Sequence, residues 1–319
     1  MSQSPNQSPP NTRQIETVVR CIFSSTSLVV ERVMEGVSTF VYRMTSRDET
    51  FYLRVLPEEG ASFAPEVAAH TLLRQRQVNV PEVIYFEQCN DLLQRSIMVT
   101  SAIKGQPLNQ SPALSEGVRE AIVAEAGREL ACINSVPVEG FGWVQRDSPE
   151  THCLRGEWST YRAFALEWWQ ADLAYLAKST LSIAEVAMLE RLISQYDSYF
   201  NSEGGYLAHG DFDSTHIYQE GGHYTGIIDL GEIRGTDRWY DLGHFHLRDG
   251  ELLPFRLEAA LVRSYGEIMP LLSDYEQRIR FTSLLINVRA LARSLQKRPP
   301  DRYTQHQLEV LRKDIAFLL

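Results

Sequence analysis

The sequence contains few cysteines, and no characteristic spacing joins them. There are only four, at Cys21, Cys89, Cys132 and Cys153, and no two of them form a C-x-x-C motif. Zinc-binding domains and disulfide-rich domains place their cysteines close together at recognisable spacings. The sequence therefore predicts neither kind of domain, and we expect reduced thiols in a cytoplasmic protein.

Long apolar runs and basic runs are missing as well. No segment approaches the roughly 20 apolar residues that a membrane helix needs, and the N-terminus lacks the order of a signal peptide. The formal net charge is −10, whereas nucleic-acid binding relies on clustered Lys and Arg that contact phosphates. We therefore expect no membrane or nucleic-acid partner; an acidic chain suits cationic small ligands better. The oligomeric state is left open.

The chain does contain enough apolar sequence for two hydrophobic cores. It has 319 residues, of which 44% are apolar, and chains of this length commonly divide into two domains. Residues 1–13 are rich in Ser, Gln, Asn and Pro, so we expect a disordered tail there. We expect a nucleotide-binding N-lobe at 14–104 and a C-lobe with the catalytic loop and acceptor pocket at 105–319.

The N-lobe pattern is that of strands followed by one helix. Strand-like alternation from Arg20 to Val55 predicts three antiparallel strands, over 27–30, 38–44 and 50–55. Pro65 opens a helical pattern over 65–74. Two further strands, over 82–86 and 96–100, would complete a five-stranded antiparallel sheet with one helix.

Beyond Gly105 the pattern becomes helical. The exception is 206–230, which predicts two short strands around the turn at Gly221 and Gly222. The predicted fold class is α+β, with a small β-rich N-lobe before a larger, mainly helical C-lobe. The expected helices of the C-lobe span 114–133, 158–178, 183–200, 251–271, 275–296 and 304–317.

Three polar motifs follow one another in the C-terminal half. They are H-G-D-F-D-S-T-H at 209–216, I-I-D-L-G-E at 227–232 and D-R-W-Y-D-L at 237–242. Phosphoryl transfer from a nucleotide needs a group that orients the acceptor hydroxyl, metal ligands and a cation on the phosphates. Asp211 is the candidate base. Asp229 ends an apolar strand and is a candidate ligand for Mg²⁺, which takes one or two carboxylates plus phosphate oxygens. His216 stands at the H-x-D-x4-N spacing of a second metal ligand.

With these motifs the sequence resembles the aminoglycoside phosphotransferase family, which is related to choline kinase and other small-molecule kinases. The resemblance runs from roughly Val30 to Phe245 and is strongest over 206–245. It implies a bilobal, protein-kinase-like fold, with Asp211 as the catalytic base and Asp229 as the principal metal ligand. It also implies that Asp237, Tyr240 and Asp241 support the catalytic loop.

The sequence departs from the family pattern at several positions. His216 stands where the family usually has an asparagine, as a histidine does in the family's 2″-type aminoglycoside kinases. Mg²⁺ is the expected metal; because oxygen ligands suit this hard cation better than an imidazole does, Mn²⁺ is an alternative. Glu232 stands where many relatives have Asp, and Asn134 where a histidine is common. Arg54 stands where a protein kinase has Lys, and its guanidinium still offers a fixed positive charge. No H-R-D, D-F-G or A-P-E run is present, which argues against a protein kinase.

The remaining expected site residues lie mainly in the N-lobe. Glu66 is placed to form an ion pair with Arg54, the alternative being a pair that only stabilises the lobe. The phosphate-covering turn is expected at Gly36, Ser38 and Thr39. The hinge, whose backbone would meet the adenine, is expected at 98–102, with Val99 and Ser101. In the C-lobe, His209 is expected to brace the catalytic loop by hydrogen bonding rather than to transfer a proton.

The acceptor side carries no specific motif. The aromatic residues of 158–175, with Glu167 and Asp172, would either cage a cationic substrate or pack a helical core. The sequence predicts a kinase that moves the γ-phosphate of ATP or GTP to a hydroxyl of a small polar acceptor, cationic acceptors included. The alternative is a nucleotide-binding pseudokinase module with little or no turnover.

Overall fold

The computed structural model describes residues 8–23, 28–34, 39–47, 49–147 and 153–319. The chain divides into two compact units. The first unit comprises Met1–Lys104, Gln145–Leu154 and Gly226–Gly231, and the second comprises Gly105–Val144, Arg155–Thr225 and Glu232–Leu319. Two short segments from the later part of the chain thus belong to the first unit, and one of them contains Asp229.

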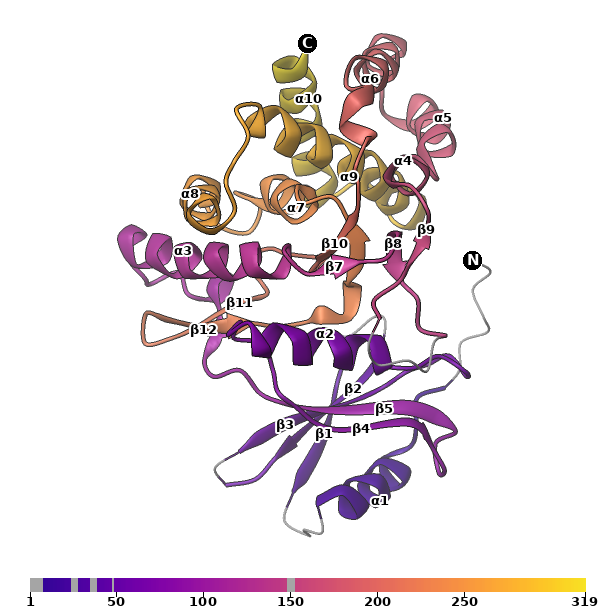
Figure 1. Cartoon of the computed structure of the whole chain (residues 1–319), viewed down its shortest axis with the longest axis vertical. Helices are drawn as coiled ribbons and strands as arrows, with labels where there is room; N and C mark the ends of the chain where they lie inside the picture. The colour runs from indigo at the N-terminus through magenta and orange to yellow at the C-terminus, as the bar shows by residue number, and fades with distance from the viewer. Residues whose placement is uncertain (1–7, 24–27, 35–38, 48, 148–152) are drawn as a thin grey trace. The chain divides into compact units, whose positions relative to one another are not determined.

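A five-stranded antiparallel sheet organises the first unit (Figure 1). Its strand order is β1-β2-β3-β5-β4, so β3 and β5 lie in its interior. Successive residues of a strand point to opposite faces; Leu53 and Val99 pack on one face and Met98 on the other. The elements are α1 (Thr12–Phe23), β1 (Val29–Val33), β2 (Phe40–Thr45), β3 (Thr50–Val55), α2 (Ala64–Gln75), β4 (Val83–Asn90) and β5 (Arg95–Ser101).

Helix α1 was not predicted from the sequence. We expected a disordered tail to residue 13 and a strand pattern from Arg20, but one amphipathic helix, Thr12–Phe23, includes the last residues of that tail and the first residues of that pattern. Ile15, Val18 and Val19 recur at helical spacing and are buried against the sheet. Asn11 caps the helix, since its Oδ1 accepts a hydrogen bond from the amide of Gln14 at 3.0 Å.

The second unit combines helices with two small sheets. One sheet has the strand order β7-β10-β13-β8-β9 and the other β12-β11-β6. The strands are β6 (Gln106–Pro107), β7 (Pro137–Val138), β8 (Phe141–Val144), β9 (Gly156–Trp158), β10 (Gly205–Ala208), β11 (Ile217–Glu220), β12 (His223–Ile227, whose last two residues belong to the first unit) and β13 (Arg234–Thr236). The helices are η1 (Leu108–Gln110), α3 (Glu116–Ile133), α4 (Tyr161–Ala165), α5 (Trp169–Ser179), α6 (Ile183–Gln195), η2 (Asp197–Phe200), η3 (Leu230–Glu232, whose first two residues belong to the first unit), α7 (Tyr240–Arg248), α8 (Glu258–Ile268), α9 (Tyr275–Lys297) and α10 (Arg302–Leu318).

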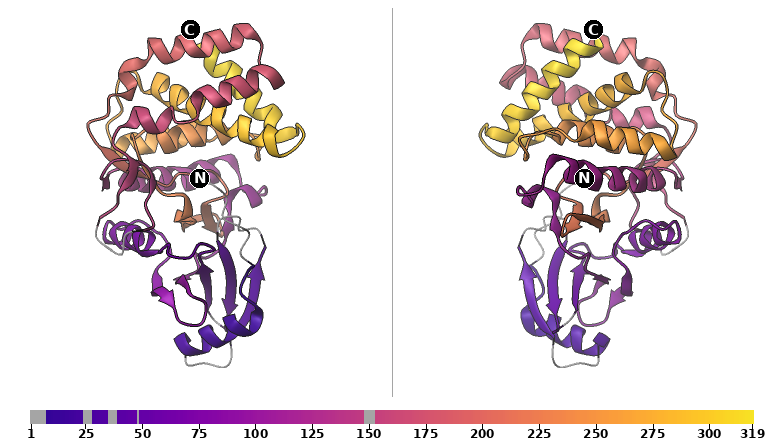
Figure 2. Two further views of the ribbon diagram at one scale, coloured as in Figure 1. Left: turned by 90° about the vertical axis from the view of Figure 1, so that its right-hand side faces the viewer. Right: turned by 90° about the vertical axis from the view of Figure 1, so that its left-hand side faces the viewer.

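Helix α9 runs through the second unit, and α5, α7 and α10 pack against it (Figure 2). Leu284, Val288 and Leu291 of α9 are fully or almost fully buried in the main apolar cluster. Helix α3 packs instead on α8, and the two backbones approach closely at Gly127: a Cβ there would lie 2.6 Å from the carbonyl oxygen of Leu261. A larger residue at this crossing would push the helices apart.

The structure corrects several predicted helices. The helix expected over 158–178 is broken into α4 and α5, and the one over 251–271 begins only at Glu258. Helix α7 was not predicted, because every residue from Tyr240 to Leu247 is buried and the segment has no polar face that would mark an amphipathic helix. None of the helices in the described ranges is long and apolar enough to cross a bilayer.

Candidate active site

The candidate catalytic loop of the second unit follows β10 and begins at His209. Gly210 opens it with φ of 90°, and a Cβ at this position would lie 2.0 Å from the carbonyl oxygen of Glu232. Glycine is therefore required for both the backbone conformation and the close approach. The turn directs the next residue, Asp211, out of the sheet.

A buried carboxylate on α7 holds this loop. The two oxygens of Asp241 accept hydrogen bonds from the amides of His209 and Gly210, each at 2.8 Å. The side-chain amide of Asn134 also donates to Asp241, at 2.8 Å, and to the carbonyl oxygen of Leu207, at 2.9 Å. Asp241 is fully buried, so these charge-assisted hydrogen bonds fix the start of the loop strongly.

The carboxylate of Asp211 is contacted by a histidine that the sequence analysis did not identify. Nε2 of His244, also on α7, lies 3.3 Å from Oδ1 of Asp211. Nδ1 of His244 lies 3.1 Å from the carbonyl oxygen of Phe212. A carbonyl oxygen only accepts hydrogen bonds, so Nδ1 carries a proton. The side chain of Asp211 is 47% exposed and is open to a ligand on its other side.

His216 lies at the end of the same loop, and its hydrogen bond to the loop backbone defines the tautomer of its ring. Its Nδ1 lies 2.6 Å from the carbonyl oxygen of Asp211 and therefore donates a hydrogen bond to it. In the neutral ring the lone pair is then on Nε2, the nitrogen that a metal would bind. His209 is fully buried, and its Nδ1 accepts from the amide of Asp211 at 3.3 Å. These contacts agree with a bracing role for His209.

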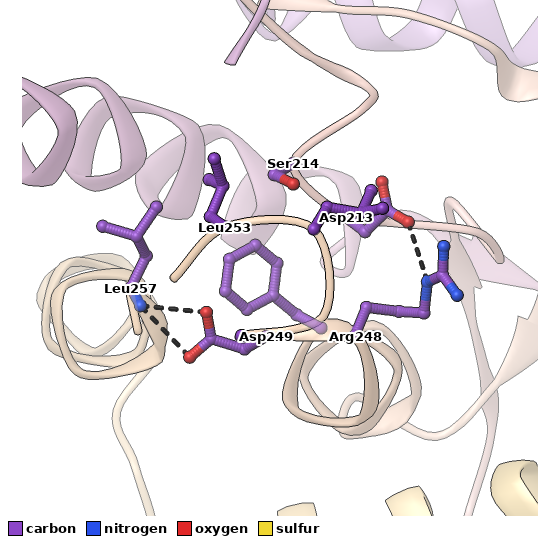
Figure 3. A pocket seen from close by; sticks show the side chains of 9 residues that line it. Asp213, Ser214, Arg248, Asp249, Leu253 and Leu257 are labelled. Carbon is purple, nitrogen blue, oxygen red and sulfur yellow. Dashed lines mark hydrogen bonds and ion pairs between the residues drawn. The ribbon is translucent and has the colours of Figure 1, made fainter. Parts of the chain in front are cut away.

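Next to the loop lies a small pocket at the end of α7 (Figure 3). The carboxylate of Asp213 forms an ion pair with Nε of Arg248 at 3.1 Å. Against the effect of burial, the neighbouring His216 ring and the positive charge of Arg248 lower the pKa of Asp213 to about 2. The pocket volume is about 10 Å³, which is room for about one water molecule. It is too small for an acceptor substrate and serves to anchor the loop.

The first unit contains the other charged cluster. Arg54 of β3 forms an ion pair with Glu66 of α2, and Nη2 of Arg146 lies 3.8 Å from the second oxygen of Glu66. Burial raises the pKa of the Glu66 carboxyl, and the two arginines oppose this effect. The side chain of Glu66 is only 2% exposed, so its ionised form depends on these cations.

Asp229 lies beside this cluster, in a strained turn after β12. Its φ is 64°, a conformation that non-glycine residues seldom adopt and that is often found at functional sites. Its Oδ1 accepts from the amide of Gly231 at 3.3 Å and lies 4.0 Å from Nη2 of Arg54. The side chain is 53% exposed, so its oxygens are accessible to a cation.

The other predicted nucleotide-binding residues lie in different environments. Gly36 and Ser38 lie outside the described residues, and Thr39 is buried immediately before β2. The side chain of Val99 is fully buried in the apolar cluster beneath α1, which leaves its backbone as the part expected to meet a nucleotide. Ser101, at the end of β5, is tied to Glu82: its amide donates to the Glu82 carbonyl, and its hydroxyl accepts from the Glu82 amide at 2.9 Å.

The two remaining supporting residues act at the strand and turn before α7. Glu232 pairs with Arg234 at 3.3 Å, and Nη1 of Arg234 donates to the hydroxyl of Tyr240 at 2.6 Å. Asp237 accepts from the amide of Trp239 at 3.1 Å, and burial raises the pKa of Asp237 to about 7. Glu232 and Asp237 thus contact residues just before α7, the helix that carries Asp241 and His244.

The aromatic residues of 158–175 form a core rather than a cage. Trp169 and Tyr161 are buried in the main apolar cluster. The guanidinium of Arg289 covers the ring of Trp168 at 4.6 Å and pairs with Asp172 at 2.9 Å. The cation that these side chains hold is therefore an arginine of the protein itself.

A metal site is not complete within either unit. Over the described ranges, no group of three or more His, Cys, Asp or Glu side chains could hold a metal ion. The predicted ligands His216 and Asp229 belong to different units. Each supplies a donor of suitable chemistry, an imidazole nitrogen and a carboxylate.

A comparison with known protein families identifies the family to which this chain belongs. A model described as the phosphotransferase enzyme family matches residues 29–281. The chain belongs to this family, as the motifs predicted. No curated protein sequence matches the chain.

Solved structures of kinases share the fold. Aminoglycoside phosphotransferase APH(4)-Ia superposes with a TM-score of 0.68 at 19% identity, over 96% of this chain and 99% of that chain. The GDP complex of aminoglycoside 2′-phosphotransferase-IIIa gives 0.62 at 18% identity, over 97% and 100%. A putative fructosamine-3-kinase from Thermobifida fusca gives 0.62 at 15% identity, over 96% and 100%. The predicted fold class is confirmed.

Proposed function

We propose that this protein is a small-molecule kinase that transfers the γ-phosphate of ATP or GTP to a hydroxyl of a small polar acceptor. The observation that carries the proposal is the loop around Asp211, which combines fixed amides on one side with an exposed carboxylate on the other. In phosphoryl transfer, a positioned carboxylate orients the acceptor hydroxyl and takes its proton.

His244 completes this arrangement as a positioning residue. Because its Nδ1 proton is committed to the carbonyl of Phe212, the contact between Nε2 and Asp211 is favourable only with one proton between them. That proton holds one carboxylate oxygen and leaves the other to the acceptor hydroxyl. His244 would thus set the direction in which the Asp211 carboxylate points.

We assign the phosphate side to Arg54, Asp229 and His216. Asp229 and Nε2 of His216 would hold the metal, with Mg²⁺ as the first candidate and Mn²⁺ as the second, since imidazole suits Mn²⁺ better. A metal held there would neutralise charge on the phosphates. Arg54 adds a fixed positive charge within 4.0 Å of Asp229. Thr39, Ser101 and the backbone of Val99 stay in the proposal as contacts of the nucleotide, together with Gly36 and Ser38.

Two observations on related structures support the choice of substrates. APH(4)-Ia has been crystallised with ADP and with AMP-PNP, in both cases together with hygromycin B. Aminoglycoside 2′-phosphotransferase-IIIa has been crystallised with GDP. We therefore propose either purine nucleotide as the donor and an amine-bearing polyol as the first class of acceptor to test.

The test is acceptor-dependent release of ADP or GDP, over a panel that begins with hygromycin B and extends to choline and homoserine. We expect Asp211→Asn to lower the rate by about 100-fold or more and His244→Gln by about tenfold, because general-base catalysis contributes 10²–10⁴-fold. Asp197→Asn is the matched control, because Asp197 is 60% exposed and pairs only at the surface with Arg162.

Two results would contradict the proposal. One is a wild-type rate in the Asp211→Asn variant. The other is stabilisation by nucleotide in a thermal-shift titration with Mg²⁺ or Mn²⁺, without turnover on any acceptor of the panel. The second result would instead support a nucleotide-binding module.

A further inference from the structure

A second pocket in the second unit lies away from the catalytic loop. Its volume is about 180 Å³, far larger than the pocket of about 10 Å³ at the end of α7. It is bounded by η2, by the first residues of β10 and by the turn before α7. Tyr206 of the lining is the second residue of β10, whereas Asp211 follows the other end of that strand.

Arg238 is the unusual member of this lining. Its guanidinium stacks on the ring of Tyr206 at 4.2 Å, and Nη2 donates to the hydroxyl of Tyr206 at 2.9 Å. Nη1 faces the sulfur of Met269 at 3.3 Å, and Nε is buried without a hydrogen-bond partner. Sulfur is a weak acceptor. In the described part of the chain no carboxylate pairs with this guanidinium, although a charge so placed usually has one.

Arg278 brings a second guanidinium to the same pocket. Its Nε contacts both oxygens of Asp274, at 3.0 and 3.1 Å, and its plane stacks on Tyr199 at 4.1 Å. No hydrogen bond within the described ranges engages its two terminal amino groups. The lining also contains apolar and aromatic side chains, including Trp239 and Tyr265.

The charge balance of the pocket favours an anion. Two guanidinium groups line it, and Asp237 is the one carboxylate among the lining residues. Because burial raises the pKa of Asp237 to about 7, this carboxylate carries only part of its charge at neutral pH. Asp274 neutralises Arg278 from outside the lining. A positive charge therefore remains unbalanced at Arg238.

We infer that this pocket is a binding site for a small aromatic carboxylate. Guanidinium groups bind the planar carboxylate group in a bidentate manner, and the aromatic walls provide stacking surfaces for a ring. The carboxylate would replace the sulfur of Met269 as the acceptor for Arg238. The site lies apart from Asp211 and does not depend on the proposed phosphoryl transfer.

The experiment is a titration of the full chain with 4-fluorobenzoate, followed by ¹⁹F NMR. We expect saturable binding to the wild type, with a dissociation constant at least tenfold higher in Arg238→Gln and in Arg278→Gln. Arg263→Gln is the matched control, because Arg263 is an exposed arginine on α8 that does not line the pocket. Asp211→Asn should bind as the wild type does, which separates this site from the catalytic loop.

Two further measurements use only the wild type, so they test the inference even if an arginine variant fails to fold. The neutral analogue 4-fluorobenzyl alcohol should bind at least tenfold more weakly than 4-fluorobenzoate. Sulfate should not displace 4-fluorobenzoate at equal concentration. Equal affinity for the alcohol, displacement by sulfate, unchanged binding in both arginine variants or absence of saturable binding would each overturn the assignment.

Discussion

The buried carboxylate of Asp241 gives the sharpest test of how the catalytic loop is held. In Asp241→Asn the side chain keeps its shape, but one oxygen becomes an amino group. The best orientation keeps the oxygen that faces the amide of His209 and the side chain of Asn134. The new amino group then faces the amide of Gly210, where both groups are donors.

The expected magnitude follows from these three hydrogen bonds. An unsatisfied buried amide costs about 1–3 kcal/mol, and a hydrogen bond to a neutral acceptor is weaker by roughly 1 kcal/mol than one to a charged acceptor. The smaller cost of burying an amide than a carboxylate offsets part of this loss. We expect the free energy of unfolding of the second unit to fall by about 3 kcal/mol.

Tryptophan fluorescence measures this loss selectively during urea unfolding. All five tryptophans, Trp143, Trp158, Trp168, Trp169 and Trp239, belong to the second unit. Asp197→Asn serves as the control and should change the free energy by less than about 0.5 kcal/mol, as exposed substitutions usually do. If Asp241→Asn unfolds within that same margin of the wild type, the three hydrogen bonds do not hold the loop.

Two further predictions concern the other buried charges. Arg54→Ala should destabilise the first unit by about 3–5 kcal/mol, because Glu66 stays buried without its main cation. Arg54→Met combined with Glu66→Leu should recover most of this loss. Hydrogen exchange of the α2 amides measures both, and a single variant as stable as the double one would refute the reasoning. His246 donates to Asp314 at 3.0 Å and to Glu258 at 2.8 Å. Although burial favours the neutral ring, these carboxylates raise the pKa of His246 to about 9 from 6.5. The stabilisation, up to about 3 kcal/mol, should be fully present below pH 6.5 and lost as the pH rises to 9. Urea unfolding at pH 6, 7.5 and 9 tests this, and a wild type with the same pH dependence as His246→Gln would contradict it.

The sequence predicts the first unit well because its signals are local. Alternating β-branched and aromatic residues mark the strands, and each strand lies within a few residues of its predicted range. Helix α1 was missed although Ile15, Val18 and Val19 are at helical spacing, because the β-branched residues around Arg20 favoured a strand interpretation.

The candidate site is less predictable, since its contacts join distant parts of the chain. The motif around Asp211 identifies the carboxylate, but its neighbour His244 lies 33 residues later and has no signature of its own. For the same reason the sequence left open whether the aromatic residues of 158–175 form a cage or a core. Nothing near Trp168 in sequence indicates that Arg289, on another helix, occupies the aromatic face.

Helix α7 sets a limit on how this protein can diversify. Asp241, His244, His246 and Arg248 each serve a separate partner from nine consecutive positions, so few substitutions in the helix leave all four partners satisfied. Variation in acceptor choice would therefore have to arise elsewhere. A library for new substrates should keep residues 240–248 fixed and randomise the surfaces that surround the catalytic loop.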